Sequence, residues 1–150
     1  MKFATKAVRA GIKPDPTTGA IVPPIYQSAN YVLESVGKDR GYDYTRSSNP
    51  TRTVLEDNLA ALEGGKYCKA FASGMSAVDA VMKLFSAGDH IVSGDDVYGG
   101  VTRLFNQILT RYGITFTYVD ATNPENIENA IQDNTKMIWL ETPSNPLLKI

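Results

Sequence analysis

The chain has 150 residues, of which 43% are hydrophobic and 21% are charged. These values are ordinary for a globular protein, and this length allows a domain that buries roughly 68–70% of its unfolded surface. The 15 basic and 16 acidic residues leave a net charge of −1. This balance gives no electrostatic basis for binding nucleic acid or an anionic membrane, so both classes of partner are excluded.

The cysteine content and the apolar runs indicate a cytoplasmic protein. Cys68 is the single cysteine, which excludes an internal disulfide and fits a reducing compartment. The first residues, Met-Lys-Phe-Ala-Thr-Lys, lack the apolar core of a secretory signal. No run approaches the roughly 18 apolar residues of a membrane span. The lone Cys68 and the lone His90 offer no ligand set for a metal.

The first third of the chain predicts an irregular arm followed by a helix. Residues 13–52 are rich in Pro, Gly, Tyr, Ser and Asn and have little periodicity. Such long irregular segments are usually functional or packed on a partner, so we expect residues 1–48 to form an extended N-terminal arm. Asn49 can cap a helix that has Pro50 at its first position and Gly64 just past its end.

After this helix, strand-like and helical patterns alternate. We predict strands at 67–72, 90–94, 114–119 and 136–141 and helices at 75–86, 99–112 and 124–132, with Gly113 as a C-terminal cap. This alternation is typical of an α/β fold with a mostly parallel sheet. Ligands of such sheets bind beyond the carboxyl ends of the strands. These ends carry Ser73-Gly74, Asp95-Asp96-Val97-Tyr98 and Thr142-Pro143-Ser144-Asn145.

The Ser73-Gly74-Met75 junction has the features of an anion site. Free backbone N–H groups and the Ser73 hydroxyl stand at a predicted helix N-terminus, which favours an anion. Arg46 can add a forked, charge-assisted bond to the same group. The alternative is an ordinary strand-to-helix turn, because Ser and Gly are common there. In either case the Met75 side chain is expected in the core. No dinucleotide fingerprint or P-loop is present.

Two tyrosines are further candidates for ligand contacts. Tyr44 and Arg46 are two residues apart, so on an extended arm they face the same way and can reach one phosphate. The alternative is that both are surface residues. Tyr98 follows a strand and precedes Gly99-Gly100, which allows close approach of a ligand. It can stack on a flat heteroaromatic ring or, alternatively, be a tyrosine at the edge of the core.

Five motifs stand in the order found in one enzyme family: Tyr44-x-Arg46, Asn49-Pro50-Thr51-Arg52, Ser73-Gly74-Met75, Asp95-Asp96-Val97-Tyr98-Gly99-Gly100 and Glu141-Thr142-Pro143-Ser144-Asn145-Pro146. From Gly19 to Ile150 the chain resembles the trans-sulfuration enzymes, the family of pyridoxal-phosphate (PLP) dependent cystathionine lyases and synthases. The resemblance implies a PLP-dependent transferase-like fold (fold type I) and PLP as the cofactor. Residues 49–150 would be the first part of its PLP-binding domain, which continues downstream.

The resemblance also implies roles for the candidate residues, and these roles fall into three groups. The first group holds the cofactor phosphate: Ser73 with the Gly74 and Met75 amides, and Tyr44 and Arg46 from the neighbouring subunit, on which the arm would pack. The second group holds the ring: Tyr98, which stacks on it and takes part in proton transfer, and Asn145, which bonds its hydroxyl. The third is Arg103, near the substrate. From local sequence alone, Asn145 is a turn residue and Arg103 belongs to a solvated helix face.

The resemblance implies a γ-elimination that converts cystathionine to cysteine, 2-oxobutanoate and ammonia in a cytoplasmic homotetramer, a dimer of dimers. Relatives that catalyse γ-replacement, namely cystathionine γ-synthase and O-acetylhomoserine sulfhydrylase, remain open. Methionine γ-lyases carry a cysteine where this chain has Gly100. No lysine of the chain matches the Ser-x-x-Lys stretch that binds PLP as a Schiff base. We therefore expect catalysis only from a longer parent. The alternative of another class is an inactive α/β binding or interaction module.

Overall fold

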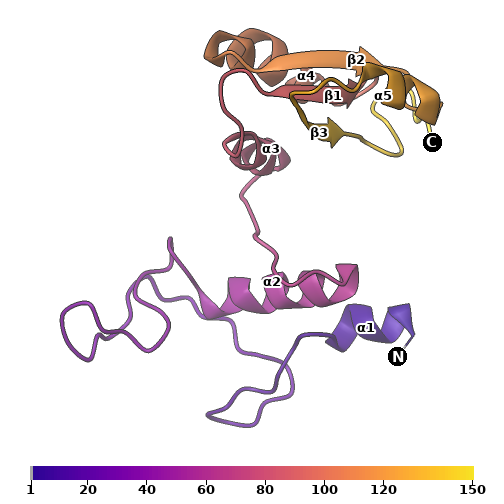
Figure 1. Cartoon of the computed structure of the whole chain (residues 1–150). Helices are drawn as coiled ribbons and strands as arrows, with labels where there is room; N and C mark the ends of the chain where they lie inside the picture. Colours follow the sequence, from indigo (N-terminus) through magenta and orange to yellow (C-terminus); the bar gives the residue numbers. More distant parts are fainter. Residues whose placement is uncertain (1) are drawn as a thin grey trace. The chain divides into compact units, whose positions relative to one another are not determined.

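A computed structural model of the chain describes residues 2–150, which form two compact units (Figure 1). The N-terminal unit ends at Ala70 and the C-terminal unit begins at Phe71. The N-terminal unit contains the helices α1 (Phe3–Arg9) and α2 (Pro50–Glu63). The C-terminal unit contains the sheet. None of the helices described in residues 2–150 has the length and apolar character that a membrane crossing requires.

In the N-terminal unit, α1 packs on α2 through a close backbone approach. The side-chain amide of Asn58 on α2 donates to the Ala10 carbonyl at 2.7 Å and so holds the end of α1. Gly11 follows with φ +73°, and a Cβ there would lie 2.4 Å from the Asp57 carbonyl oxygen. Only glycine fits both this conformation and this space. The sequence patterns did not predict α1.

The predicted ends of α2 are confirmed. The Asn49 side chain accepts from the Thr51 N–H at 2.8 Å, Pro50 occupies the first turn, and Gly64 ends the helix with φ +67°. The Asn49 amide nitrogen also donates to the Tyr26 carbonyl at 3.2 Å and to the Thr45 hydroxyl at 2.9 Å. One buried side chain therefore caps the helix and fixes the irregular segment before it.

The strand predicted at 67–72 is wrong. The structure has no strand there, and the Ala70 N–H donates to the Glu56 carboxylate at 3.0 Å instead of to a neighbouring strand. Burial of Glu56 opposes its ionisation. The hydrogen bonds from Ala70 and Lys69 and the charges of Lys69 and Arg52 outweigh this, so the Glu56 pKa is lowered. An apolar run becomes a strand only where a partner strand receives its hydrogen bonds.

The C-terminal unit contains a parallel three-stranded sheet in the order β2-β1-β3. The strands are β1 (His90–Gly94), β2 (Thr115–Val119) and β3 (Thr135–Trp139). All five residues of central β1 are buried. The remaining strand predictions are thus confirmed, with ends that shift by one or two residues.

Three helical segments accompany these strands: α3 (Gly74–Met82) precedes β1, the segment 99–112 connects β1 to β2, and α5 (Pro124–Ala130) connects β2 to β3. The segment 99–112 begins as the α-helix α4 (Gly99–Arg103), continues as the π-helix η1 (Leu104–Ile108) and ends as the 3₁₀ turn η2 (Leu109–Tyr112). Gly113 caps it with φ +79°, as predicted. The helix α3 ends before the predicted residue 86, because tighter bonds such as Phe85 N–H to the Met82 carbonyl replace the helical ones.

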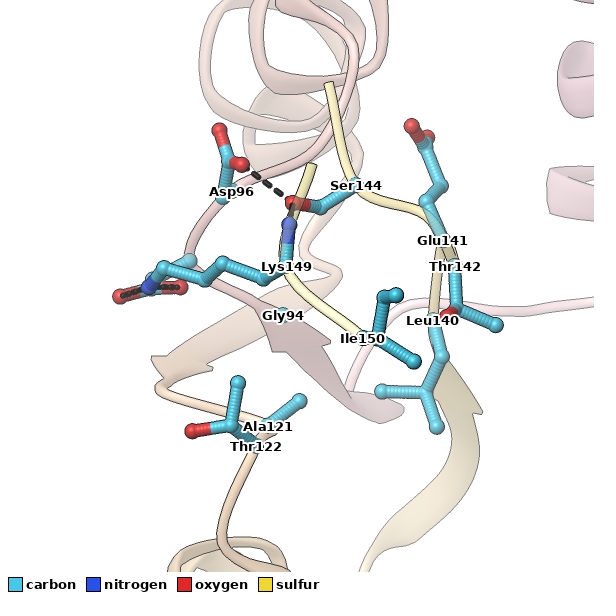
Figure 2. Close-up of a pocket in the computed structure, with 11 residues that line it drawn as sticks. Gly94, Asp96, Ala121, Thr122, Leu140, Glu141, Thr142, Ser144, Lys149 and Ile150 are labelled. Carbon is cyan, nitrogen blue, oxygen red and sulfur yellow. Dashed lines mark hydrogen bonds and ion pairs between the residues drawn. The ribbon is translucent and has the colours of Figure 1, made fainter. Parts of the chain in front are cut away.

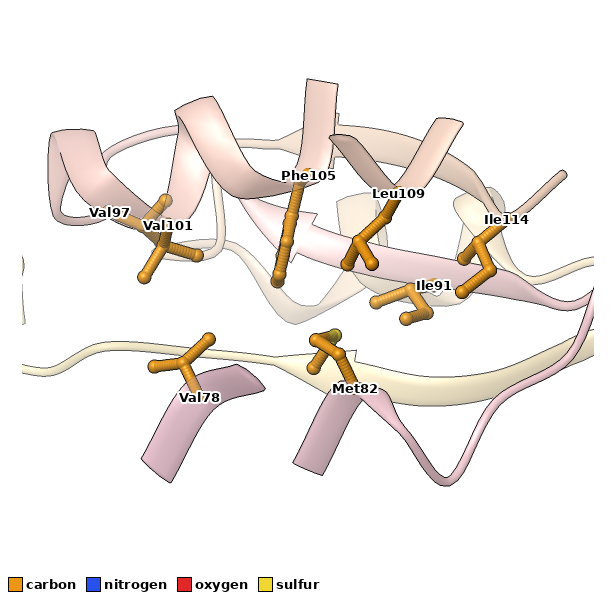
Figure 3. Packing of buried hydrophobic residues seen from close by; sticks show 8 residues of the cluster. All are labelled: Val78, Met82, Ile91, Val97, Val101, Phe105, Leu109 and Ile114. Carbon is orange, nitrogen blue, oxygen red and sulfur yellow. The ribbon is translucent and has the colours of Figure 1, made fainter. Parts of the chain in front are cut away.

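The core of this unit lies between α3, β1 and the segment 99–112 (Figure 3). It consists of Val78, Met82, Ile91, Val97, Val101, Phe105, Leu109 and Ile114. Phe105 stacks on Phe116 of β2 with centroids 4.5 Å apart and meets Trp139 of β3 edge-on at 6.0 Å. A single aromatic side chain thus joins the helical layer to both outer strands.

At the other end of the sheet, His90 joins the three strands. Its ring is buried, with Nδ1 2.7 Å from the Thr135 hydroxyl and Nε2 2.9 Å from the Thr117 hydroxyl. Burial lowers the pKa of this imidazole. His90 therefore has the structural place that the sequence predicted, at the amino end of β1.

Candidate functional site

The N-terminus of α3 presents two backbone N–H groups to open space. Ser73 is the N-cap, and its hydroxyl accepts from the Ser76 N–H at 3.1 Å. Within residues 2–150, the Gly74 and Met75 N–H groups donate to no protein acceptor. A Cβ built on Gly74 would meet no atom within 4 Å. The helix end is therefore open to an anion, which both the free donors and the helix dipole stabilise.

This helix end faces Tyr98 in one cleft of about 430 Å³. The cleft is lined by Ser73, Gly74, Met75, Val78, Tyr98, Val101 and Glu141. It combines donors at α3 with the aromatic ring of Tyr98 and three apolar residues, and its size is within the range of small-ligand sites. The structure thus brings together four of the predicted site residues, Ser73, Gly74, Met75 and Tyr98.

Tyr98 has a defined position at the start of α4. The residue is 48% exposed, so it is not part of the core. A Cβ on Gly100 would lie 2.6 Å from the Tyr98 ring and 3.0 Å from the Met75 sulfur. The absence of a side chain at Gly100 therefore lets the ring lie close to the backbone of α4, beside Met75.

Glu141 lines the same cleft, and its importance was not predicted. Its Oε2 accepts from the Tyr98 N–H at 2.9 Å, and its Oε1 accepts from the Trp139 indole N–H at 3.3 Å. The carboxylate thus joins the loop after β1 to the end of β3. The available sequence signal was an acidic residue at the last position of the predicted strand 136–141, at the edge where ligands bind.

Asn145 lies in a turn after β3 and does not line the cleft. Its side chain is exposed, and the neighbouring Ser144 is buried. The turn is closed by the Ser144 N–H, which donates to the Lys149 carbonyl at 2.9 Å, and by the Leu148 N–H, which donates to the Ser144 carbonyl at 3.1 Å. Asn145 is therefore held through its backbone, with its amide group available to a ligand.

A second cavity, of about 220 Å³, lies beyond the ends of the three strands and is shown in Figure 2. Lys149 lies in its wall and contacts Asp95 at 3.0 Å and Asp120 at 3.7 Å. The hydrogen bond to Asp95 is the main cause that raises the Lys149 pKa, and hydrogen bonds from Thr122 are the main cause that lowers the Asp120 pKa. Both effects favour the charged forms of this surface cluster.

The predicted pair Tyr44 and Arg46 lies in the N-terminal unit. The Arg46 guanidinium contacts the Tyr44 hydroxyl at 3.4 Å and lies 5.3 Å from the centre of its ring. Both side chains are exposed, so they do face the same way. Arg103 is exposed on α4, and its Nη1 would be 3.8 Å from a Cβ on Gly99, which places it one turn after Tyr98.

These observations fit a flat, anionic ligand such as PLP. The donors at α3 suit a phosphate, and the Tyr98 ring offers a stacking surface in the same cleft. Within residues 2–150 no group of three or more His, Cys, Asp or Glu side chains is arranged to hold a metal ion. The cleft itself offers hydrogen-bond donors for an anion and an aromatic surface side by side.

The sequence model of the Cys/Met metabolism PLP-dependent enzymes matches residues 4–150. The chain belongs to this family. The chain is 50% identical over 148 residues to a probable cystathionine γ-synthase of Herpetosiphon aurantiacus. The aligned residues make up 99% of this chain and 46% of that protein. The chain is also 49% identical over 146 residues to a cystathionine β-lyase of Lactococcus lactis. Here the aligned residues make up 97% of this chain and 38% of that protein.

The fold of this family is confirmed by a solved relative. The crystal structure of cystathionine γ-lyase from Lactobacillus plantarum, complexed with L-serine, matches with a TM-score of 0.91 and 48% identity. The match covers 100% of this chain and 39% of that one. The chain therefore has the α/β fold of the PLP-dependent fold type I enzymes, and it spans less than half the length of these relatives.

Proposed function

We propose that the protein that carries this chain is a PLP-dependent enzyme of sulfur amino acid metabolism that cleaves cystathionine by γ-elimination. The products would be cysteine, 2-oxobutanoate and ammonia. The observation that carries the proposal is the cleft in which the open N-terminus of α3 faces the Tyr98 ring. When bound, PLP supplies an electron sink for the carbanions that such eliminations require.

In this proposal the α3 end holds the phosphate. The Gly74 and Met75 N–H groups donate to its oxygens, and the Ser73 hydroxyl lies beside them. Open space at Gly74 supports this role, because the phosphate can approach the backbone without meeting a side chain. Charged acceptors strengthen such bonds, so this end of the cleft would provide much of the affinity.

The ring end of the cleft would be formed by two residues. Tyr98 stacks on the pyridine ring, and its hydroxyl helps to move protons during the elimination. Asn145 donates its side-chain amide to the ring hydroxyl; its exposed position in a closed turn supports this. Arg103, which is exposed on α4 after Tyr98, is proposed to bind a carboxylate of the substrate.

The arm, residues 1–48, is proposed to pack on a neighbouring subunit, where Tyr44 and Arg46 would bind the partner's cofactor phosphate. Apolar residues that are exposed on the arm support this: Val22, Ile25, Val32 and Val36. Exposed apolar side chains at this density mark interaction surfaces. A homotetramer in the cytoplasm, built as a dimer of dimers, is the assembly we propose.

Two related reactions are the alternatives. The similarity to a γ-synthase favours γ-replacement, in which a thiol replaces the γ-substituent, as in cystathionine γ-synthase or O-acetylhomoserine sulfhydrylase. The similarity to a β-lyase favours β-elimination of cystathionine. The two identities are nearly equal, so they give no preference.

Product analysis separates these reactions. The purified protein, as its gene encodes it, is incubated with cystathionine and PLP, and the products are identified by mass spectrometry. The γ-elimination yields cysteine and 2-oxobutanoate, whereas β-elimination yields homocysteine and pyruvate. Cystathionine formed only from an activated homoserine and cysteine would instead establish γ-replacement. Absence of any PLP-dependent product would contradict the proposal.

A further inference from the structure

The loops that follow β1 and β3 exchange carboxylate hydrogen bonds in both directions. Asp96, in the loop after β1, accepts from the Ser144 hydroxyl and from the Leu147 N–H at 2.9 Å. Glu141, in the loop after β3, accepts from the Tyr98 N–H at 2.9 Å. Each loop therefore supplies one carboxylate that binds the backbone of the other. We call Asp96 and Glu141 the carboxylate pair.

The Asp96 carboxylate brackets Asn145. One oxygen, Oδ2, receives both bonds, from the residue before Asn145 and from the residue two positions after it. Figure 2 shows the Asp96 and Ser144 side chains pointing toward one another. The buried Ser144 hydroxyl also accepts from the Lys149 N–H at 2.8 Å. This turn therefore depends on one carboxylate oxygen of the neighbouring loop.

The Glu141 carboxylate fixes the backbone from which the Tyr98 ring projects. Its two oxygens are used separately, Oε2 by the Tyr98 N–H and Oε1 by the Trp139 indole N–H. The Trp139 ring in turn meets the buried Phe105 edge-on. The position of Tyr98 is thus coupled to the core through Glu141 and Trp139.

The neighbouring carboxylate of Asp95 differs from the carboxylate pair, because within residues 2–150 it accepts no hydrogen bond from the backbone of the other loop. The hydrogen bonds of the Asp95 carboxylate in the described part of the chain go to the Lys149 ammonium group, and this ion pair is partly exposed. Exposed ion pairs contribute little to stability. Hydrogen bonds from backbone N–H groups to a carboxylate define the geometry of a loop more closely, because the donor is part of the chain itself.

We infer that Asp96 and Glu141 are positioning residues that hold Tyr98 and Asn145 at a fixed separation, so that both contact one planar cofactor ring. The identity of that ring as PLP rests on the proposed function. The coupling between the loops does not, because it consists of hydrogen bonds between residues of this chain. Neither carboxylate needs to touch the cofactor.

Amide hydrogen exchange of the full-length protein, freed of PLP, tests the coupling directly. Asp96→Ala removes the acceptor of the Leu147 N–H, and exchange at Leu147 is expected to accelerate by roughly ten- to hundredfold. The matched control is Asp95→Ala, which removes the adjacent carboxylate and is expected to leave Leu147 unchanged. Equal Leu147 exchange in Asp96→Ala and the unmodified protein would overturn the inference.

Two isosteric variants separate positioning from general destabilisation. Asp96→Asn keeps an oxygen that can accept both bonds, so it is expected to retain most of the Leu147 protection. Glu141→Gln keeps one acceptor oxygen for two donors, the Tyr98 N–H and the Trp139 indole N–H. One of these two N–H groups therefore loses its acceptor, and its exchange is expected to accelerate by about tenfold. Retained protection of both N–H groups in Glu141→Gln would remove Glu141 from the pair. Both variants are expected to fold, because their volumes are unchanged.

Cofactor titration then tests the consequence for the site. In Glu141→Gln, the dissociation constant of PLP is expected to rise by about tenfold and the circular dichroism of the bound cofactor to weaken, with Asp96→Asn closer to the unmodified protein. If the unmodified protein binds no PLP, the proposed function fails while hydrogen exchange still decides the coupling. If it binds PLP and all variants match it in affinity and dichroism, the positioning role is wrong.

Discussion

Tyr98 depends for its position on groups other than its own hydroxyl. Its N–H is held by Glu141, and its ring lies over Gly100 beside the Met75 sulfur. Local sequence predicted Tyr98 as a candidate, because an aromatic residue before two glycines after a strand is a visible pattern. It did not predict the role of Glu141, since an acidic residue at the end of a predicted strand does not show that its bonding partner is Tyr98, which is distant in the sequence.

The Tyr98 hydroxyl and the Tyr98 ring have separable roles in our proposal. Tyr98→Phe keeps the stacking surface and removes the hydroxyl. We expect PLP affinity within about twofold of the unmodified protein and turnover lower by about 10²-fold, the lower end for general acid–base catalysis. PLP titration and turnover at saturating cofactor measure the two quantities. Unchanged turnover would show that the hydroxyl moves no proton in the slow step.

His90 makes the stability of the fold depend on pH. Burial lowers its pKa from the ordinary value of 6.5, so below that value the unfolded chain binds a proton that the folded chain does not. The His90 contribution to stability is therefore complete above pH 6.5 and decreases as the pH falls below it. We expect the Tm to decrease between pH 7.5 and about 5.5.

His90→Gln is the variant that tests this origin. It removes the titrating ring and can bond only one of the two threonine hydroxyls, so its Tm is expected to be lower at neutral pH and to change less between pH 7.5 and about 5.5. Carboxylates such as Glu56 titrate at lower pH, outside this window. An equal pH dependence in both proteins would assign the effect to another group.

At the scale of secondary structure, short sequence patterns predicted those helix ends that are fixed by hydrogen bonds between residues close in the sequence. The α2 helix begins and ends where Asn49, Pro50 and Gly64 indicate, because caps act within a few residues. The strand at 67–72 was wrong because a strand also requires a distant partner. The change of the segment 99–112 from α to π to 3₁₀ was not predicted, because the spacing of apolar residues does not distinguish these helix types over so few residues.

Asn49 gives a test of how one cap organises the arm. Asn49→Ala removes the cap and the donors to the Tyr26 carbonyl and the Thr45 hydroxyl. We expect the free energy of unfolding to decrease by about 2–3 kcal/mol. Asn49→Asp keeps the cap oxygen and loses the donors, so its decrease is expected to be smaller. Urea unfolding measures both, and equal losses would mean that the cap contributes nothing.

At the scale of the whole molecule, the predicted site comes from two units of the chain. Ser73, Gly74, Met75 and Tyr98 lie in one cleft of the C-terminal unit, and Tyr44 and Arg46 lie in the N-terminal unit. The family and its cofactor were predictable because five short motifs occur in order. The reaction was not, because relatives that perform different eliminations and replacements are equally similar.

Mixed subunits test the proposal that Arg46 acts on a partner's cofactor. Arg46→Ala and Tyr98→Ala subunits are each expected to be nearly inactive. In a hybrid pair, one site has both residues intact and the other has neither. A one-to-one mixture should therefore regain about a quarter of the unmodified activity, because half of the pairs are hybrids. No gain in hybrids verified by mass spectrometry would mean that Arg46 serves its own subunit.

The most direct test of our central claim, that the N-terminus of α3 binds the PLP phosphate, is a comparison of Gly74→Pro with Gly74→Ala. Proline suits the first position of a helix, and the extended Ser73 (φ −154°, ψ 158°) can precede it. It lacks the N–H, whereas alanine keeps it. The dissociation constants of PLP and of pyridoxal, which has no phosphate, are measured for both full-length variants. We predict PLP binding at least about tenfold weaker in Gly74→Pro than in Gly74→Ala, with equal pyridoxal binding. Equal PLP affinity in the two variants would contradict the claim.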